Sequence, residues 1–410
     1  MEDVKIIQEI CSSFDVSLYD KLSSDTKKYL LEYIKTIKSK SRKVNALLKM
    51  LSNRASPVVK YIDILQGPVS VIELKGPSKH IYLFGDRHVY MGECEKEGKF
   101  KGMSQSDISS WMYQNIKNSD KFIDLFIEKP YHKTDKLENI SSDIYIDKLH
   151  NKFKECASIH KDICPIPNMR YHYSDIRRLT TNKDLNMLMM ILTDFFNVNY
   201  GTINYYFTLR KDDKAYRDTI EYVYTLLYYV YNFLKNFKTY KNLLAYLSKN
   251  YKVDKQISNI KDAFIKEKLL LTIESFSYDD SIIRWNDRLD LCRLFLEDMR
   301  AKIDTNAQEI PLYYKELTDL LFLLFNILNH FFELYILGRI FRSYDDKKEL
   351  YSKPAQNIIV FTGYLHTINI KNMLINMGFK IIFKTGAHSQ STEPKSQCMD
   401  ISKMKQPLFE

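Results

Sequence analysis

Two apolar runs, each followed by a glycine and a histidine, stand out in the hydrophobic pattern of the chain. Residues 81–84 are Ile-Tyr-Leu-Phe, and Gly85-Asp-Arg-His88 follows them. Residues 358–361 are Ile-Ile-Val-Phe, and Gly363-Tyr-Leu-His366 comes soon after. Short β-prone runs bounded by glycine are typical of buried strands that end in a turn. The pattern therefore predicts two strands that each deliver a histidine to one edge of a sheet.

The chain after the first histidine predicts a βαβ unit. A helix is expected at about 106–116, and the next apolar run ends at Glu128. A further alternating segment ends near Asp175 and Arg177. Strand, helix and strand within about fifty residues indicate a largely parallel sheet. Because open α/β sheets bind ligands outside the carboxyl ends of their strands, we expect these side chains to meet the two histidines.

Helical periodicity with little Gly or Pro dominates much of the remaining chain. The expected fold class is α/β, with a mostly parallel central sheet flanked by helices and a large all-helical insertion. The expected parts are an N-terminal helical cap (1–60), the first part of the α/β core (61–180), the helical insertion (181–345), the second part of the core (346–384) and a flexible polar tail (385–410).

The stretch 317–340 is apolar enough to be tested as a membrane span. It contains Asp319, His330 and Glu333 among other polar residues. Inserting each such group into lipid would cost a few kcal/mol. We therefore expect a buried core helix and no transmembrane segment.

Cysteine usage favours free thiols. The six cysteines are widely spread and form no Cys-x-x-Cys pair; they are Cys11, Cys94, Cys156, Cys164, Cys292 and Cys398. With no N-terminal signal peptide, this predicts an intracellular reducing compartment. Cys156, His160 and Cys164 have ligand-like spacing, but they lack a nearby fourth ligand, so a structural zinc site is not favoured.

Composition is that of a folded protein. Hydrophobic residues make up 45% and charged residues 27%, which excludes disorder along the whole chain. The formal net charge of +10 would suit a polyanionic partner. The lysines are scattered, however, and no arginine stripe with interleaved aromatic residues matches a nucleic-acid reader, so nucleic acid is not an expected partner. The many Tyr, Phe, Lys, Asn and Ile residues fit an AT-rich coding sequence.

The residues expected at the strand ends can carry out hydrolytic chemistry in two ways. His88, Glu128 and His366 form a two-histidine, one-carboxylate set that could hold a divalent ion such as Mn, Co or Zn and activate its bound water. Without a metal, Glu128 or His88 could act as base, His366 as acid, and Arg87 or Arg177 as the group that stabilises an oxyanion. The candidate catalytic residues are Asp86, Arg87, His88, Glu128, Asp175, Arg177 and His366.

These motifs also resemble a known superfamily. The resemblance rests on Ile81-Tyr-Leu-Phe-Gly-Asp-Arg-His88, Asp124-Leu-Phe-Ile-Glu128, His172-Tyr-Ser-Asp175-Ile-Arg177, Glu333-Leu-Tyr-Ile-Leu-Gly-Arg339-Ile-Phe341 and Val360-Phe-Thr-Gly363-Tyr-Leu-His366. Paired Gly-x-x-His motifs of this kind resemble those that join erythromycin esterase, the ChaN-like haem-binding lipoproteins and the TraB/Tiki proteins. The chain looks closest to uncharacterised proteins of large DNA viruses, over about 80–180 and 330–384.

The resemblance specifies the residues of the site, whereas the substrates of the related proteins differ. In Tiki-like members the corresponding histidines and glutamate are proposed to bind a metal for peptide hydrolysis. Erythromycin esterase-like members are thought to hydrolyse an ester with histidine and glutamate, and ChaN-like members bind haem. These relatives also use an arginine on a helix before the second motif, for which the candidates here are Arg293, Arg300 and Arg339. The residue before the second histidine is Leu365, where a small residue is usual.

The first hypothesis is therefore a hydrolase of a peptide or ester bond. One alternative is a module that binds a metal, or less readily haem, without turnover. Another is a virion-associated structural protein with a vestigial site. The expected partners are a peptide or ester substrate and viral or host proteins, with the host cytoplasm or the virion as the compartment. The sequence leaves the oligomeric state open.

Overall fold

The computed structural model describes residues 61–88, 94, 100–130, 144–157, 166, 168–176, 182–198, 214–275, 285–305, 314–344, 354–389 and 396–409. The predicted N-terminal helical cap, 1–60, lies outside the described residues, and so does Arg177.

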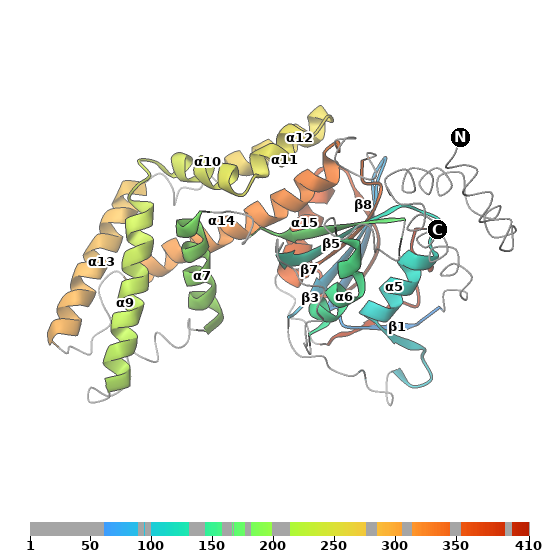
Figure 1. Cartoon of the computed structure of the whole chain (residues 1–410), viewed down its shortest axis with the longest axis horizontal. Helices are drawn as coiled ribbons and strands as arrows, with labels where there is room; N and C mark the ends of the chain where they lie inside the picture. Colours follow the sequence, from blue (N-terminus) through green and yellow to red (C-terminus); the bar gives the residue numbers. More distant parts are fainter. Residues whose placement is uncertain are drawn as a thin grey trace, which may run out of the picture. The chain divides into compact units, whose positions relative to one another are not determined.

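The chain divides into two compact units (Figure 1). Unit 1 comprises the residues up to Asp175 together with Arg339–Glu410, and unit 2 comprises Ile176–Gly338. The helical insertion expected at 181–345 corresponds to unit 2, whose bounds differ from it by several residues at each end. The last three residues of the helix that closes unit 2 belong to unit 1, which brings Arg339 into the α/β unit.

Unit 1 is built on a six-stranded, mostly parallel sheet, as the hydrophobic pattern predicted. The strands in spatial order are β6 (Met169–Asp175), β5 (Ile123–Pro130), β7 (Asn357–Gly363), β3 (His80–Asp86), β2 (Ser70–Lys75) and β8 (Lys380–Gly386). The pairs among β6, β5, β7 and β3 are parallel, whereas β2 runs antiparallel to both of its neighbours. The fold class is therefore α/β.

The register of the parallel strands brings three carboxyl ends level with one another. Asp86 at the end of β3 pairs with Gly363 at the end of β7. Ile127 of β5 pairs with Phe361 of β7, and the β5 ladder with β6 becomes irregular between Ile127 and Pro130. Glu128 thus follows the last regular pair, two residues before the strand ends.

Helices cover both faces of this sheet. The helices α5 (Ile108–Asn118) and α6 (Tyr145–Phe153) pack against one face in a continuous hydrophobic core. The helix α15 (Tyr364–Asn376) packs on β3, β7 and β2, and it begins directly after Gly363. A Cβ on Gly85 would lie 2.8 Å from the Cα of Tyr364, so this helix approaches β3 closely because residue 85 is glycine.

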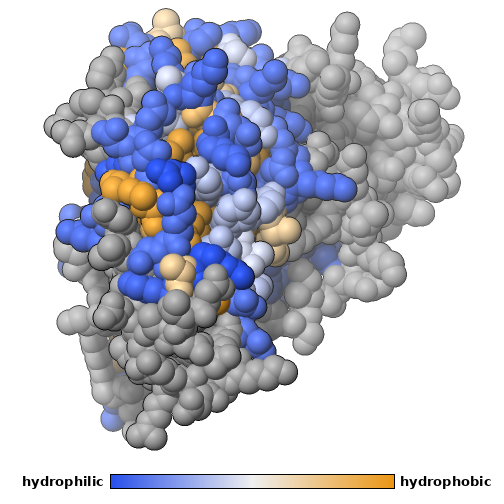
Figure 2. Space-filling model, turned by 90° about the vertical axis from the view of Figure 1, so that its left-hand side faces the viewer, coloured by the Kyte–Doolittle hydropathy of each residue, from blue (hydrophilic) through white to orange (hydrophobic). Residues whose placement is uncertain are grey.

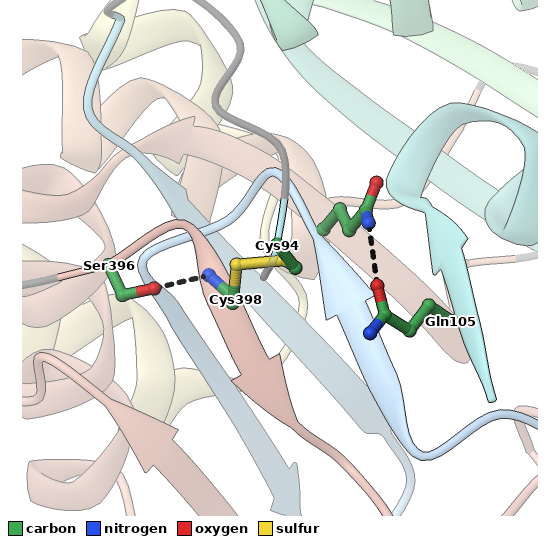
Figure 3. Close-up of a disulfide and its surroundings, with 5 residues drawn as sticks. Cys94, Gln105, Ser396 and Cys398 are labelled. Atoms are coloured by element: carbon green, nitrogen blue, oxygen red, sulfur yellow. Dashed lines mark hydrogen bonds between the residues drawn. A yellow bond between two sulfur atoms is a disulfide. The ribbon is translucent and has the colours of Figure 1, made fainter. Parts of the chain in front are cut away.

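A small second sheet in unit 1 joins distant parts of the chain. It has the order β4 (Gln105–Asp107), β1 (Ile64–Gln66) and β9 (Cys398–Asp400). A disulfide between Cys94 and Cys398 fixes the start of β9 (Figure 3). The prediction of free thiols is therefore wrong for these two cysteines, and Cys156 is also disulfide bonded. Cys292 is a free, buried thiol as expected.

The prediction of a flexible tail is wrong for residues 396–409. Met399, Ile401 and Leu408 belong to the main hydrophobic core of unit 1. The side chain of Gln406 bonds both the backbone N–H and the carbonyl of Ile62. The tail was predicted to be flexible because most of its residues are polar. Its few apolar residues are too widely spaced to form a periodic pattern.

We expect Leu408→Ala to lower the free energy of unfolding by about 2–3 kcal/mol, because it removes a fully buried side chain from a packed core. Urea unfolding measures the change, with the exposed Lys405→Ala as a control. A Leu408→Ala variant as stable as the control would show that the tail is not part of the core.

Unit 2 consists of helices in its described residues. They are α7 (Lys183–Val198), α9 (Lys214–Leu234), α10 (Tyr240–Asn250), α11 (Val253–Ser258), α12 (Ala263–Ser275), α13 (Trp285–Thr305) and α14 (Tyr314–Phe341), of which the last extends into unit 1. On the face seen in Figure 2, hydrophobic residues gather in patches bordered by hydrophilic ones.

Among the described residues, α14 is the one helix long and apolar enough to cross a membrane. Of its most apolar window, 67% is buried inside the protein, as in the core helix of a soluble protein. Glu333 on this helix is fully buried and lies 2.8 Å from the Nδ1 atom of His330. Length and composition alone are weak evidence for a membrane span, and these observations fit a core helix.

Candidate functional site

The carboxyl edge of the main sheet brings together both motif histidines and Glu128. The Nε2 atom of His88 lies 3.5 Å from Oε2 of Glu128, and Nε2 of His366 lies 3.9 Å from Oε1. The Glu128 side chain is buried at 6% exposure, whereas that of His88 is 40% exposed. One buried carboxylate therefore lies between two imidazoles, one of which opens to solvent.

The two histidines belong to different kinds of local backbone structure. His88 follows β3 and has a φ of 55°, a left-handed conformation that residues other than glycine rarely adopt. His366 lies in the first turn of α15, so the second Gly-x-x-His motif is the start of a helix and not the turn that was expected. Both histidines project to the same side because β3 and β7 end level with each other.

His88 lies between two carboxylates. Its Nδ1 atom is 3.3 Å from Oδ2 of Asp86, which is itself buried. Burial of the ring lowers the pKa of His88, but the neighbouring carboxylates of Asp86 and Glu128 outweigh this and raise the pKa to about 10. His88 is therefore a cation at neutral pH and does not act as a base there.

Gly363 packs the site tightly. Its backbone N–H donates a 2.7 Å hydrogen bond to Oε2 of Glu128, which fixes the carboxylate at the end of β7. A Cβ at this position would lie 3.1 Å from Nε2 of His88 and 3.6 Å from both Glu128 and the ring of His366. A side chain at this position would therefore crowd His88, while its distances to Glu128 and His366 would be those of ordinary contact.

Three other residues, Arg87, Asp175 and Arg177, were also predicted to belong to the site. Arg87 is exposed, and its backbone N–H donates to Oδ1 of Asp86. Asp175 is buried at the end of β6, where it pairs with Pro130 of β5. Asp175 therefore reaches the same edge of the sheet as Glu128. Arg177, the other residue expected near the end of this strand, lies outside the described residues.

A divalent ion was one expected occupant of this set. Two imidazoles and a carboxylate are suitable ligands for Zn, Mn or Co. Among the described residues, however, no group of three or more His, Cys, Asp or Glu side chains is arranged to hold a metal ion. The donor types fit a metal, whereas the three side chains as arranged form a carboxylate paired with two imidazoles.

A second polar network on the same face of β5 was not predicted as a unit. Asp124, Phe126 and Glu128 alternate along β5 and so project to one face. Oδ1 of Asp124 lies 2.6 Å from Nε of Arg170 and 2.7 Å from Nε2 of His172. The ring of His172 stacks on Phe126, with the ring centroids 4.1 Å apart.

Arg339 determines which ring nitrogen of His172 carries the proton. Its Nη2 atom lies 2.9 Å from Nδ1 of His172. An arginine can only donate, so Nδ1 accepts and Nε2 carries the proton that is donated to Asp124. Burial, together with the positive charges of Arg339 and Arg170, lowers the pKa of His172 to about 3, so the ring is neutral. His172 is therefore a buried structural histidine.

The contacts of the three candidate arginines distinguish them from one another. Arg293 pairs with Glu297 at 2.7 Å and Arg300 with Glu221 at 3.9 Å, on exposed parts of unit 2. Arg339 lies in unit 1 and bonds the buried network beside β5. Within the α/β unit, Arg339 is thus the candidate that contacts the sheet, through His172 and not through the motif histidines.

The raised pKa of His88 predicts a pH-dependent stability in metal-free protein. Its stabilising contribution is complete below the unfolded pKa of 6.5 and is lost as the pH rises through about 10. We expect the difference in unfolding free energy between wild type and His88→Gln to shrink steadily between pH 6.5 and 10. Chemical unfolding in the presence of a chelator measures it. A difference that is constant over this range would contradict the pairing of His88 with Asp86 and Glu128.

Comparison of the chain with protein-family models, with curated proteins and with solved structures gave no match. The resemblance carried by the Gly-x-x-His motifs therefore remains a prediction.

Proposed function

We propose that unit 1 hydrolyses a peptide or ester bond, with Glu128 activating a water molecule between His88 and His366. The observation that supports this most is the placement of one buried carboxylate 3.5 Å and 3.9 Å from two imidazole nitrogens. This group lies at the carboxyl edge of a parallel sheet, where open α/β folds bind ligands. Acid–base groups held by strand and helix ends are suited to proton transfer.

The proposal gives each side chain one role. Glu128 takes a proton from water as the hydroxide attacks the carbonyl carbon. His88, a cation beside Asp86 and Glu128, stabilises the developing oxyanion through its positive charge. His366 protonates the departing alcohol or amine and recovers a proton from Glu128, so that one water molecule is consumed in each cycle.

A divalent ion is part of the proposal as a cofactor to be tested. His88, Glu128 and His366 would hold it, and it would lower the pKa of a bound water molecule. Because His88 would have to lose its proton to bind a metal, affinity should rise with pH. The acid–base roles of Glu128 and His366 apply to the metal-free site, because ligation of an ion would use the same atoms.

The test is a hydrolysis screen on protein purified without chelator or affinity metal, with its metal content measured by mass spectrometry. Chromogenic esters and fluorogenic peptides are offered to chelator-treated protein, alone and with Mn, Co or Zn. Hydrolysis that survives the chelator supports metal-free water activation, and hydrolysis that returns only with one ion supports a metal site. No hydrolysis, with a Soret band after haem addition or with viral or host proteins co-purifying, would contradict the proposal in favour of a binding or structural role.

A further inference from the structure

The Cys94–Cys398 disulfide lies close in sequence to the catalytic histidine. Residues 89–93 separate His88 from Cys94, whose side chain is buried at 3% exposure. Cys398 begins β9, whose middle residue, Met399, pairs with Leu65 of β1 and belongs to the main core. Figure 3 shows the disulfide at the edge of this small sheet. The bond thus ties Cys94, the sixth residue after His88, to the core of unit 1.

The small sheet is itself joined to the carboxyl end of β3. The backbone N–H of Gly67 donates to the carbonyl of Gln397, beside Cys398. The N–H of Val69 donates to the carbonyl of Gly85, in the first Gly-x-x-His motif. The disulfide and the start of the motif are therefore anchored to the same short segment between β1 and β2.

His88 needs such an anchor. Its left-handed backbone, with φ at 55°, is an unfavourable conformation that persists only where its surroundings hold it. Contacts of the side chain with Asp86 and Glu128 hold it on one side. On its other side the chain is covalently held at Cys94.

We propose that the Cys94–Cys398 disulfide is a redox control of the site, which holds His88 in place when oxidised and releases it when reduced. The inference rests on the proposed hydrolase function. Reduction transfers two electrons and two protons from a dithiol: the S–S bond breaks, each cysteine gains an S–H, and the dithiol becomes a disulfide. The site is then active in oxidising conditions and weakened in reducing ones.

The experiment compares oxidised and dithiol-reduced wild type with the double variant Cys94→Ser/Cys398→Ser. Because Cys156 also takes part in a disulfide, the double variant isolates the effect of this one bond. Cys292→Ser, which removes a buried free thiol in unit 2, is the matched control. Two readouts are taken: hydrolysis, and the rate at which diethylpyrocarbonate modifies His88, followed by mass spectrometry with His330 as an internal reference.

We expect reduced wild type and the double variant to lose hydrolysis by about tenfold to a hundredfold, as a small misplacement of a catalytic group does. We also expect His88 to be modified faster, with His330 and the Cys292→Ser variant unchanged. The same hydrolysis and the same labelling of His88 in both redox states would overturn the proposal.

The labelling separates this inference from the proposed function. If neither redox state hydrolyses any substrate, the hydrolase proposal fails, whereas faster labelling of His88 on reduction still supports control by the disulfide. Circular dichroism monitors the fold of each sample. If breaking the bond unfolds the protein and exposes all histidines alike, the effect is global and the proposal of local control is wrong.

Discussion

Glu128→Gln is expected to lower kcat/KM for hydrolysis by about 10²- to 10⁴-fold, the range typical of losing a general base. The amide cannot take a proton from water, although its oxygen can still accept the N–H of Gly363. The variant should therefore fold normally while losing activity. Steady-state kinetics on the substrate found in the screen measures the effect.

Glu73→Gln is the matched control for this change. Glu73 is also a buried glutamate of the same sheet paired with a histidine, since its Oε1 atom lies 2.7 Å from Nε2 of His80. It lies on β2, away from the carboxyl ends that form the site. Equal losses in the two variants would indicate a general effect of removing a buried charge and would contradict the assigned role of Glu128.

Asp124→Ala is expected to lower the free energy of unfolding of unit 1 by about 3–5 kcal/mol, because it removes a buried carboxylate that contacts both Arg170 and His172. It also removes the acceptor for the Nε2 proton of His172. Trp111 reports on unit 1, and Trp285 lies in unit 2, so urea unfolding followed by fluorescence in a Trp285→Phe background isolates the effect.

The exposed Asp120 provides the comparison. It forms a surface pair with Lys121 at 3.3 Å, and loss of such a pair costs at most about 1 kcal/mol. Asp120→Asn should therefore unfold close to wild type. If Asp124→Ala were no less stable than Asp120→Asn, the network around Asp124 would not contribute to the stability of the sheet.

The strand ends could be predicted from the sequence because local pattern and fold agree there. Apolar runs ending in Gly-x-x-His place His88 and His366 at one edge, and the βαβ spacing brings Glu128 to the same edge. What the pattern could not give was the geometry of the contact. Glu128 is held by the backbone N–H of Gly363. The sequence shows that residue 363 is a glycine, but not which group its N–H contacts.

The buried network around Asp124 escaped prediction for a different reason. An aspartate within an apolar run is compatible with an exposed position as well as with a buried one. The other members of the network come from β6, whose Arg170 and His172 contact Asp124, and from the end of α14, whose Arg339 contacts His172. The alternation of Arg170 and His172 gave the one local signal, since both occupy the same face of a strand.

The disulfide was missed because spacing alone does not show which cysteines meet in space. Cys94 and Cys398 are 304 residues apart in the sequence. Their Cα atoms lie 5.7 Å apart in the folded chain, where β9 pairs with β1. The compartment in which the protein works stays a prediction, and the proposed redox control of the site bears on it directly.

The most direct test of the account is the rate of hydrolysis by wild type beside His88→Ala/His366→Ala, with His80→Ala as a histidine control at the opposite end of β3. We predict that activity falls by at least about 10²-fold in the double variant, because both the oxyanion contact and the acid are removed, and that His80→Ala retains it. Hydrolysis that persists in the double variant would contradict the assignment of this site.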